Sequence, residues 1–397
     1  MTLTSLTLTE HTPHYFENAA ISQAVGHYLW HHHRNQVAVE FPSPKTGQQW
    51  QLTNQGWVGF IPVGPDVRLN LQPKVGLANL FAMMAYAYDL NSFRLLDGLI
   101  DCRSMAEFYE RLAIILAERV LDRVRQGLYQ AYRLREAELP YVRGQLQLPQ
   151  ALQPSGRVSL PCRYETQTVD NADNQILAWT LFRLARSGVS TTRSRPLIQR
   201  AYRALQQRVT ISPYPAQACV GRVYNRLNDD YRQLHALCHF FLAQSGPSHH
   251  FGDRAMIPFL VNMAHLFEKF VASWLTAHLS DSWRVVIQER VPLGTSSPLT
   301  FQVDLAIYDA ETQQIRWVLD TKYKSDPTPA TEDIQQVLSY AHTKGCREAV
   351  LVYPAPLPQP FDEEINGIRI RSVAFSLTDD LAVAGQNFID FLLREAH

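Results

Sequence analysis

Ile315-Arg316-Trp317-Val318-Leu319-Asp320-Thr321-Lys322-Tyr323 is an apolar run that ends in two charged residues, Asp320 and Lys322. A short apolar run of this kind is typical of a strand that is covered on both faces. Side chains alternate along a strand, so Asp320 and Lys322 should lie on the same face. Because burying a carboxylate without a partner costs free energy, this segment predicts a sheet with a charged site on one face.

A second strand is predicted just before the first, over residues 301–308, with a polar turn at 309–314 between them. A hairpin whose turn centres near residue 312 places Asp304 directly opposite Asp320. Opposed like charges in neighbouring strands repel, so two aspartates there call for a bound cation or an exposed position. The apolar neighbours of Asp320 argue against exposure. We therefore expect Asp304, Asp320 and Lys322 to form one cluster.

An amphipathic helix is predicted ahead of the hairpin, where apolar residues recur at helical spacing from Phe259 to Trp274. Glu268 lies at the edge of this apolar stripe and not on the solvated face of the helix. A carboxylate in that position needs a partner. Glu268 is therefore a candidate fourth member of the cluster.

A second helix is predicted after the hairpin. Thr328 and Pro329 suit its N-cap and first position, and Gly345 suits the position after its last turn. Gln336 and Tyr340 are one helical turn apart, so they point the same way and could reach DNA or a metal-bound water.

A buried strand over residues 349–353 completes the pattern, and a right-handed crossover would make it parallel to the strand before the helix. The element order α-β-β-α-β describes a mixed sheet flanked by helices. Hydrolysis of a phosphodiester with Mg²⁺ needs carboxylates that converge on the ion and a cation near the attacking water. An Asp-x-Lys triplet alone is commonly just a salt bridge. The ordered set of carboxylates, lysine and helix residues is what points to a metal-dependent nuclease.

The 397 residues are enough for two or three domains. The alternation over residues 1–75 predicts a β-rich segment, and residues 76–245 are expected to be mostly helical. Linker-like composition occurs at 148–159 and 244–253, and the second is the better boundary. The predicted domains are thus an N-terminal region at 1–245 and a domain at 246–397 that contains the candidate nuclease site. The expected helices of the middle region span residues 77–90, 105–125, 174–186 and 228–244.

Composition excludes several other classes of protein. The five cysteines are far apart and include no CxxC pair, so neither a disulfide framework nor a zinc ribbon is indicated. The chain has no leader-like N-terminus and no apolar stretch near the roughly 18 residues of a membrane span, which predicts a cytoplasmic protein without membrane contact. The histidine runs 31–33 and 249–250 lack accompanying carboxylates and receive no metal role.

The absence of nucleotide-binding motifs and the distribution of charge both bear on which molecules the protein would bind. There is no phosphate-binding loop motif and no GxGxxG, so any nucleotide hydrolysis must come from another protein. From Arg111 to Arg232 the chain contains 19 arginines, no lysine and nine acidic residues. Arginine without lysine suits bidentate contacts to phosphate or carboxylate, although these arginines could also simply solvate helix faces.

The chain resembles the McrC family, the nuclease subunits of McrBC-type 5-methylcytosine-dependent restriction systems. The likeness is closest in the C-terminal part, and weaker pieces extend it over most of the chain. The closest segments are Phe259-Leu260-Val261-Asn262-Met263-Ala264-His265-Leu266-Phe267-Glu268-Lys269-Phe270, Val303-Asp304-Leu305, Val318-Leu319-Asp320-Thr321-Lys322-Tyr323-Lys324 and Asp333-Ile334-Gln335-Gln336-Val337-Leu338-Ser339-Tyr340-Ala341. The weaker ones are Val58-Gly59-Phe60-Ile61, Leu71-Gln72-Pro73-Lys74-Val75 and Val142-Arg143-Gly144.

This resemblance implies an α/β fold with a C-terminal PD-(D/E)xK restriction-endonuclease-like sheet and Mg²⁺-dependent cleavage of double-stranded DNA. Asp304 and Asp320 would hold the metal with support from Glu268, and Lys322 would position or activate the water. The match to the Gln-x-x-x-Tyr helix implies that Gln336 and Tyr340 assist the site.

The resemblance also implies a partner, an AAA+ GTPase ring of the McrB type, on which the N-terminal half would dock and whose hydrolysis it would stimulate. Thr321 departs from the family pattern, in which alanine is common at this position. Two alternatives stay open: a non-catalytic ring-docking activator, and a PD-(D/E)xK nuclease of another repair or defence pathway.

Overall fold

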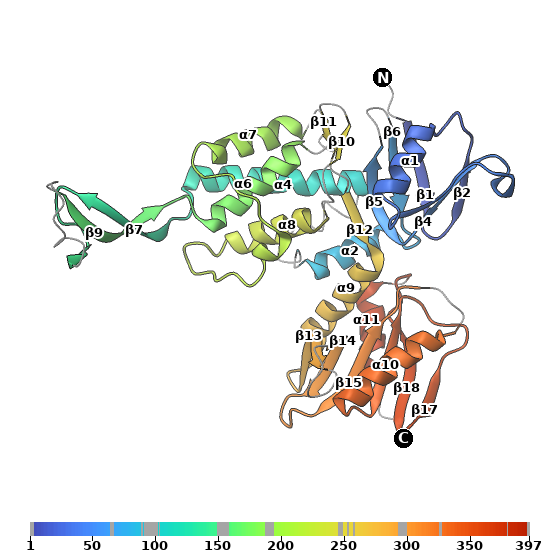
Figure 1. Ribbon diagram of the computed structural model, residues 1–397. Coiled ribbons are helices and arrows are strands. Elements are labelled where there is room, and N and C mark those ends of the chain that lie inside the picture. Colours follow the sequence, from blue (N-terminus) through green and yellow to red (C-terminus); the bar gives the residue numbers. More distant parts are fainter. Residues whose placement is uncertain are drawn as a thin grey trace. The chain divides into compact units, whose positions relative to one another are not determined.

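The computed structural model describes residues 4–63, 67–88, 90, 102, 104–148, 159–186, 194–244, 249–251, 254–256, 259–292, 300–324, 328–378 and 380–394 (Figure 1). Most of the two predicted linkers, 148–159 and 244–253, lies outside the described residues.

The chain forms two compact units. The first unit combines Met1–Phe108 with Gly246–His397, and the second is Tyr109–Ser245. The N-terminal β-rich segment and the C-terminal sheet therefore belong to one unit. A functional division between residues 1–245 and 246–397 stays a prediction.

The N-terminal part of the first unit is β-rich, as predicted. One sheet has the order β1-β6-β5-β12, in which β1 (Thr4–Thr9) runs parallel to β6 (Val67–Gln72). In the same sheet β5 (Trp57–Pro62) pairs with β12 (Phe259–Asn262), a strand from far along the chain. A second sheet of β2 (Pro13–Phe16), β4 (Trp50–Asn54) and β3 (Val37–Glu40) lies beside α1 (Gln23–His32) and the 3₁₀ helix η1 (Pro44–Thr46).

Gly59 makes the pairing of β5 with β12 possible. Its φ is 132°, and a Cβ atom on this residue would lie 2.1 Å from the carbonyl oxygen of Phe259. Only glycine fits such a backbone at such a distance. The first four residues of the predicted helix 259–274 thus form a strand, and α9 (Met263–His278) begins after Asn262, whose side chain accepts the His265 N–H as an N-cap.

The middle of the chain is largely helical, with one exception. The helices are α2 (Leu77–Ala87) and α4 (Met105–Gln126), then α6 (Ala172–Arg186), α7 (Arg195–Gln206) and α8 (Tyr231–Gln244), with a 3₁₀ helix η2 (Ala216–Cys219). The exception is a three-stranded sheet of β7 (Ala131–Leu139), β9 (Leu160–Thr168) and β8 (Gln145–Leu146). The ribbon shows β7 and β9 as an arm that extends from the helices of the second unit (Figure 1). A short hairpin, β10 (His249–Phe251) with β11 (Arg254–Met256), precedes β12.

The C-terminal part of the first unit contains the predicted mixed sheet. Its order is β13-β14-β15-β16-β18-β17. The strands are β13 (Trp283–Pro292), β14 (Thr300–Asp309), β15 (Ile315–Thr321), β16 (Glu348–Tyr353), β17 (Asp362–Ile365) and β18 (Ile368–Ala374). The pairs β15–β16 and β16–β18 are parallel, which confirms the crossover through α10 (Thr331–Lys344). Strands β13, β17 and β18 and helix α11 (Leu381–Leu393) were not predicted from the sequence.

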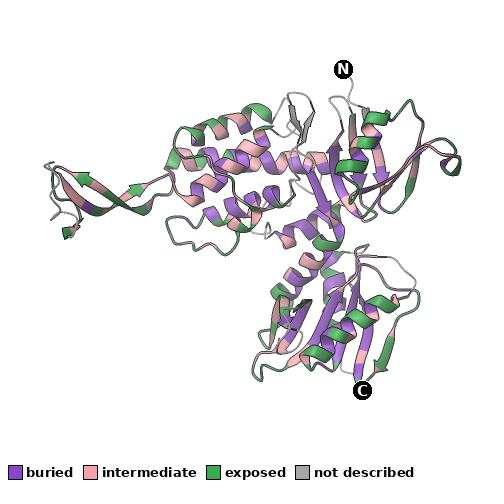
Figure 2. Cartoon of the chain, viewed as in Figure 1, coloured by how far each residue is buried: buried purple, intermediate pink, exposed green. Residues whose placement is uncertain are grey.

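The central strands are covered on both faces. All six residues of β16 are buried, and Ala349 and Leu351 pack with Val337 and Ala341 of α10 (Figure 2). The helix begins later than predicted: its N-cap is Ala330, so Thr328 and Pro329 precede the helix. Gly345 ends it in the left-handed conformation, as predicted.

Candidate functional site

The buried carboxylate of Asp320 lies at the end of β15. Its side chain is 1% exposed, and Lys322 Nζ lies 2.7 Å from Asp320 Oδ2. The backbone N–H of Lys322 donates to Val352 O at 2.8 Å, which fixes the residue beside β16. The structure therefore places both residues together, as the alternation of the strand predicted.

Asp304 lies where β14 separates from β15. The predicted hairpin register is confirmed by the pairs Leu305–Leu319 and Ala306–Val318, and its next step would oppose the two aspartates. At that step the Asp304 carboxylate replaces a backbone acceptor: its Oδ2 accepts the Thr321 N–H at 3.1 Å and the Thr321 hydroxyl at 3.3 Å. The hydroxyl contact uses the residue at which this chain departs from the family pattern.

Burial and neighbouring carboxylates perturb both aspartates. Burial, followed by the neighbouring Asp304 charge, raises the pKa of Asp320 to about 7. Burial, followed by the charge of Glu268, also raises the pKa of Asp304. Buried acidic groups whose ionisation is opposed by neighbouring carboxylates in this way are a site that a bound cation would stabilise.

Lys322 is the centre of a polar network that reaches α10. Its Nζ donates to Gln336 Oε1 at 2.9 Å, and Gln336 Nε2 donates to the Tyr340 hydroxyl at 2.7 Å. Burial lowers the pKa of Lys322, but the surrounding carboxylates, Asp320 first, outweigh it, so the pKa lies above its usual value. The structure thus brings Gln336 and Tyr340 to the lysine through a chain of hydrogen bonds.

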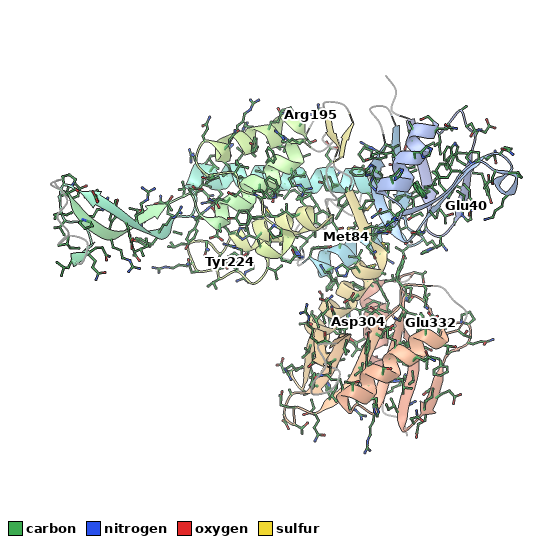
Figure 3. The ribbon with its side chains drawn as sticks, viewed as in Figure 1. Glu40, Met84, Arg195, Tyr224, Asp304 and Glu332 are labelled. Carbon is green, nitrogen blue, oxygen red and sulfur yellow. The ribbon has the colours of Figure 1, made fainter. Side chains whose placement is uncertain are left out.

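Asp333 is a member of this network that the sequence analysis did not select. It is almost fully buried in the first turn of α10, with its Oδ1 3.6 Å from Lys322 Nζ and its Oδ2 2.5 Å from Lys324 Nζ. In Figure 3 the labelled Glu332, the residue before it, marks this turn of the helix. The signal that could have found it is an acidic residue one helical turn before Gln336.

Glu268 lies on α9 at the other side of Asp304. Its Oε1 accepts from Gln288 Nε2 at 2.9 Å, and its Oε2 lies 3.5 Å from His265 Nδ1. Burial raises the pKa of Glu268, but these hydrogen bonds outweigh it, so the pKa lies below its usual value. Glu268 is therefore held ionised near enough to Asp304 to influence its titration.

The donor set fits a magnesium ion held by few protein ligands. Within the described ranges, no three His, Cys, Asp or Glu side chains are grouped closely enough to hold an ion together. Mg²⁺ is commonly held by only one or two carboxylates, with waters and substrate phosphate completing its shell. Asp304 and Asp320 supply two such carboxylates, and metal ligation by them and by Glu268 stays a prediction.

The mixed sheet of this α/β fold brings a buried Asp-x-Lys pair and a second aspartate together at a strand end. Figure 3 labels that second aspartate, Asp304. The family model described as McrBC 5-methylcytosine restriction system component matches residues 52–354. The chain therefore belongs to the family of McrBC restriction system components.

A solved structure shares this fold, and a second is reported beside it. One is a chain in the refined half-complex from the tetradecameric assembly of Thermococcus gammatolerans McrB AAA+ hexamers with bound McrC, at 17% identity and a TM-score of 0.55, covering 98% of this chain and 99% of that chain. Another belongs to the cryo-EM structure of the Thermococcus gammatolerans McrBC complex, at 18% identity and a TM-score of 0.46, covering 70% and 89% of the two chains. No curated protein sequence matches this chain. None of the described helices combines the length and the apolar character that crossing a bilayer requires.

Proposed function

We propose that this chain is the nuclease subunit of a modification-dependent restriction complex, a cytoplasmic endodeoxyribonuclease that hydrolyses double-stranded DNA with Mg²⁺. The observation that carries the proposal is the buried carboxylate of Asp320 beside Lys322, whose pKa is raised by burial and by the neighbouring Asp304 charge. A purely structural sheet gains nothing from this repulsion, whereas a cation bound between the two carboxylates would remove it.

Each residue of the site has a distinct task in this proposal. Asp304 and Asp320 would hold Mg²⁺, which supplies positive charge to the phosphate oxygens and lowers the pKa of a bound water. Lys322, kept protonated by its carboxylate neighbours, would stabilise the developing negative charge near the attacking water. Gln336 and Tyr340 would fix the direction of the lysine side chain through their hydrogen bonds.

We further propose that a ring-forming AAA+ GTPase is the partner and that this chain stimulates its hydrolysis. The family membership supports this, and so does the related structure, whose description names McrB AAA+ hexamers with bound McrC. The arm of β7 and β9 offers a docking element within residues 1–245. Strand β7 lacks a buried face, and Tyr132 and Leu134 are 67% and 47% exposed on it. Exposed apolar residues on an extended element are typical of protein interaction surfaces.

The test is Mg²⁺-dependent cleavage of methylated and unmethylated plasmid DNA by this chain with its AAA+ GTPase and GTP. Wild type is compared with Asp304→Ala, and Asp281→Ala, which changes an exposed aspartate, is the matched control. We expect methylation-dependent cutting by wild type and by the control, and none by Asp304→Ala. Cutting of both plasmids without the GTPase would instead indicate an independent nuclease. If wild type cuts under no condition, the chain is a non-catalytic activator of the ring.

Docking and cleavage should be separable by point substitutions. Asp320→Ala removes a carboxylate of the site, so it should abolish cleavage and leave GTPase stimulation intact. Replacing Tyr132 and Leu134 together by serine should reduce GTPase stimulation by lowering affinity for the ring. Loss of ring binding by Asp320→Ala would show that the two functions do not occupy separate regions of the chain.

A further inference from the structure

Gln288 has an unusual backbone for its place in the fold. Five non-glycine residues in the described ranges have positive φ, and four of them occupy turns or loops: His11, Gln48, Gln313 and Asn366. Gln288 alone among these lies within a strand, β13, with φ of 50°. A residue with a Cβ atom adopts this conformation at a cost, and such residues gather at functional sites.

The strained residue is opposite Asp304. Strands β13 and β14 keep one register on both sides, through the pairs Ile287–Leu305 and Glu289–Val303, but the pair Gln288–Asp304 is missing between them. On its other side, Asp304 also lies beyond the last pair with β15. Asp304 is therefore at the one position of this part of β14 where pairing with both described neighbours is interrupted.

The side chain of Gln288 uses its altered direction to reach α9. Its Nε2 donates to Glu268 Oε1 at 2.9 Å, while His265 approaches the other carboxylate oxygen. The contact thus connects the strained residue, the helix carboxylate and the aspartate opposite the strain.

We propose that Gln288 is a positioning residue, whose kinked backbone and side-chain amide together hold the Glu268 carboxylate toward Asp304. A regular strand conformation would keep the Gln288 side chain in the alternation of β13 and restore the ladder to Asp304. The kink instead frees Asp304 from that ladder and supplies a donor that fixes the helix carboxylate. Partners that orient the carboxylates of a metal site in this way change metal affinity when they are removed. This inference rests on the proposed function, since it assigns Gln288 to the same Mg²⁺ site.

The experiment measures Mg²⁺ binding to the full-length chain without DNA, by isothermal titration calorimetry, together with the thermal unfolding temperature without metal. The variants are Gln288→Gly, which accepts positive φ and loses the amide, and Gln288→Asn, which tolerates this φ but is too short to reach Glu268. Gln313→Gly is the matched control, because Gln313 also has positive φ and also donates its side-chain amide, to Ala310 O, in a turn away from the site. Asp320→Ala lacks a proposed metal ligand, so the Mg²⁺ binding that this variant loses is the binding at the site.

We expect both Gln288 variants to bind Mg²⁺ about 10- to 100-fold more weakly than wild type, and Gln313→Gly to bind it equally well. Gln288→Gly should unfold at the same or a higher temperature, because it relieves strain while it weakens binding. Unchanged affinity in both Gln288 variants, weakening in the glycine variant alone, or a fall in unfolding temperature that parallels the fall in affinity would each overturn the positioning role. Wild-type binding that Asp320→Ala leaves unchanged would overturn the proposed metal site itself.

Discussion

Replacing Asp320 by asparagine should stabilise the protein while abolishing its activity. The pKa of this carboxyl is near 7, against 3.8 for an ordinary aspartate, and one pKa unit corresponds to about 1.4 kcal/mol. Ionised Asp320 therefore costs the metal-free native state up to about 4 kcal/mol at pH 8. Asparagine has nearly the shape of the protonated acid and carries no charge, so Asp320→Asn should recover about 2–4 kcal/mol, less than the full amount because its amide faces Lys322.

The gain should depend on pH in a defined direction. Between pH 4 and 7 the native state keeps a proton on Asp320 that the unfolded chain has released, so the free energy of unfolding of wild type falls as pH rises through this window. At pH 5 most of that cost has not yet appeared, and the advantage of asparagine should shrink to at most about 1.5 kcal/mol. Since 1 kcal/mol shifts the unfolding temperature of a unit of this size by roughly 2–4 °C, the gain at pH 8 is on the order of 5–15 °C.

Scanning calorimetry with a chelator at pH 5 and pH 8 measures both quantities, with Asp281→Asn as an exposed control. Adding Mg²⁺ should then stabilise wild type and leave Asp320→Asn unchanged, because only the wild type has both carboxylates. Equal stability of the two proteins at pH 8 would refute the interpretation of Asp320 as a buried carboxylate that is destabilising when ionised. A gain in stability of the same size at both pH values would refute it as well.

Two further substitutions test the packing around the site. Gly59→Ala should destabilise the first unit by at least about 3 kcal/mol, because a Cβ atom would lie 2.1 Å from Phe259 O at a φ of 132°. Denaturant unfolding measures this change in the free energy of unfolding. The control is Gly76→Ala, where a Cβ atom meets open space, and this variant should change the stability little. Tyr323→Phe removes the hydroxyl that donates to Glu10 Oε2 at 3.2 Å. This variant should lose about 1–3 kcal/mol of unfolding free energy in the same assay, because Glu10 is fully buried. An unchanged unfolding midpoint would show that another donor satisfies this carboxylate.

The part of the site that came from local sequence was predictable, and the part that depends on distant segments was not. The alternation of side chains around Asp320 and the length of the turn at residues 309–314 predicted the hairpin and its register. The sequence predicts helix at strand β12 because the partner strand β5 lies some 200 residues earlier, and a run of three apolar residues before Asn262 does not distinguish strand from helix. Asp333 carries a local signal, one helical turn before Gln336, but its contacts with Lys322 and Lys324 follow only from where the fold places α10.

The edge strand and the arm were missed for a different reason. Strand β13 is an edge strand with mostly exposed or half-buried residues, and its alternation is broken at Gln288. Strand β7 is exposed along most of its length, so it carries no apolar alternation at all. Patterns of hydrophobicity indicate burial against a core. Strands without a buried apolar face, or strands that border a polar site, lack this alternation of apolar and polar residues.

The pairing of β5 with β12 has a consequence for synthesis of the chain. Strand β5 ends at Pro62 and its partner begins at Phe259, so the ribosome makes the whole of Tyr109–Ser245 in between. At about 5–20 residues per second, this edge of the sheet waits roughly 10–40 s for its last strand. The second unit is thus an insertion that can fold first, while an unpaired strand edge stays open to other chains. A protein cut off near residue 245 would keep that edge open permanently.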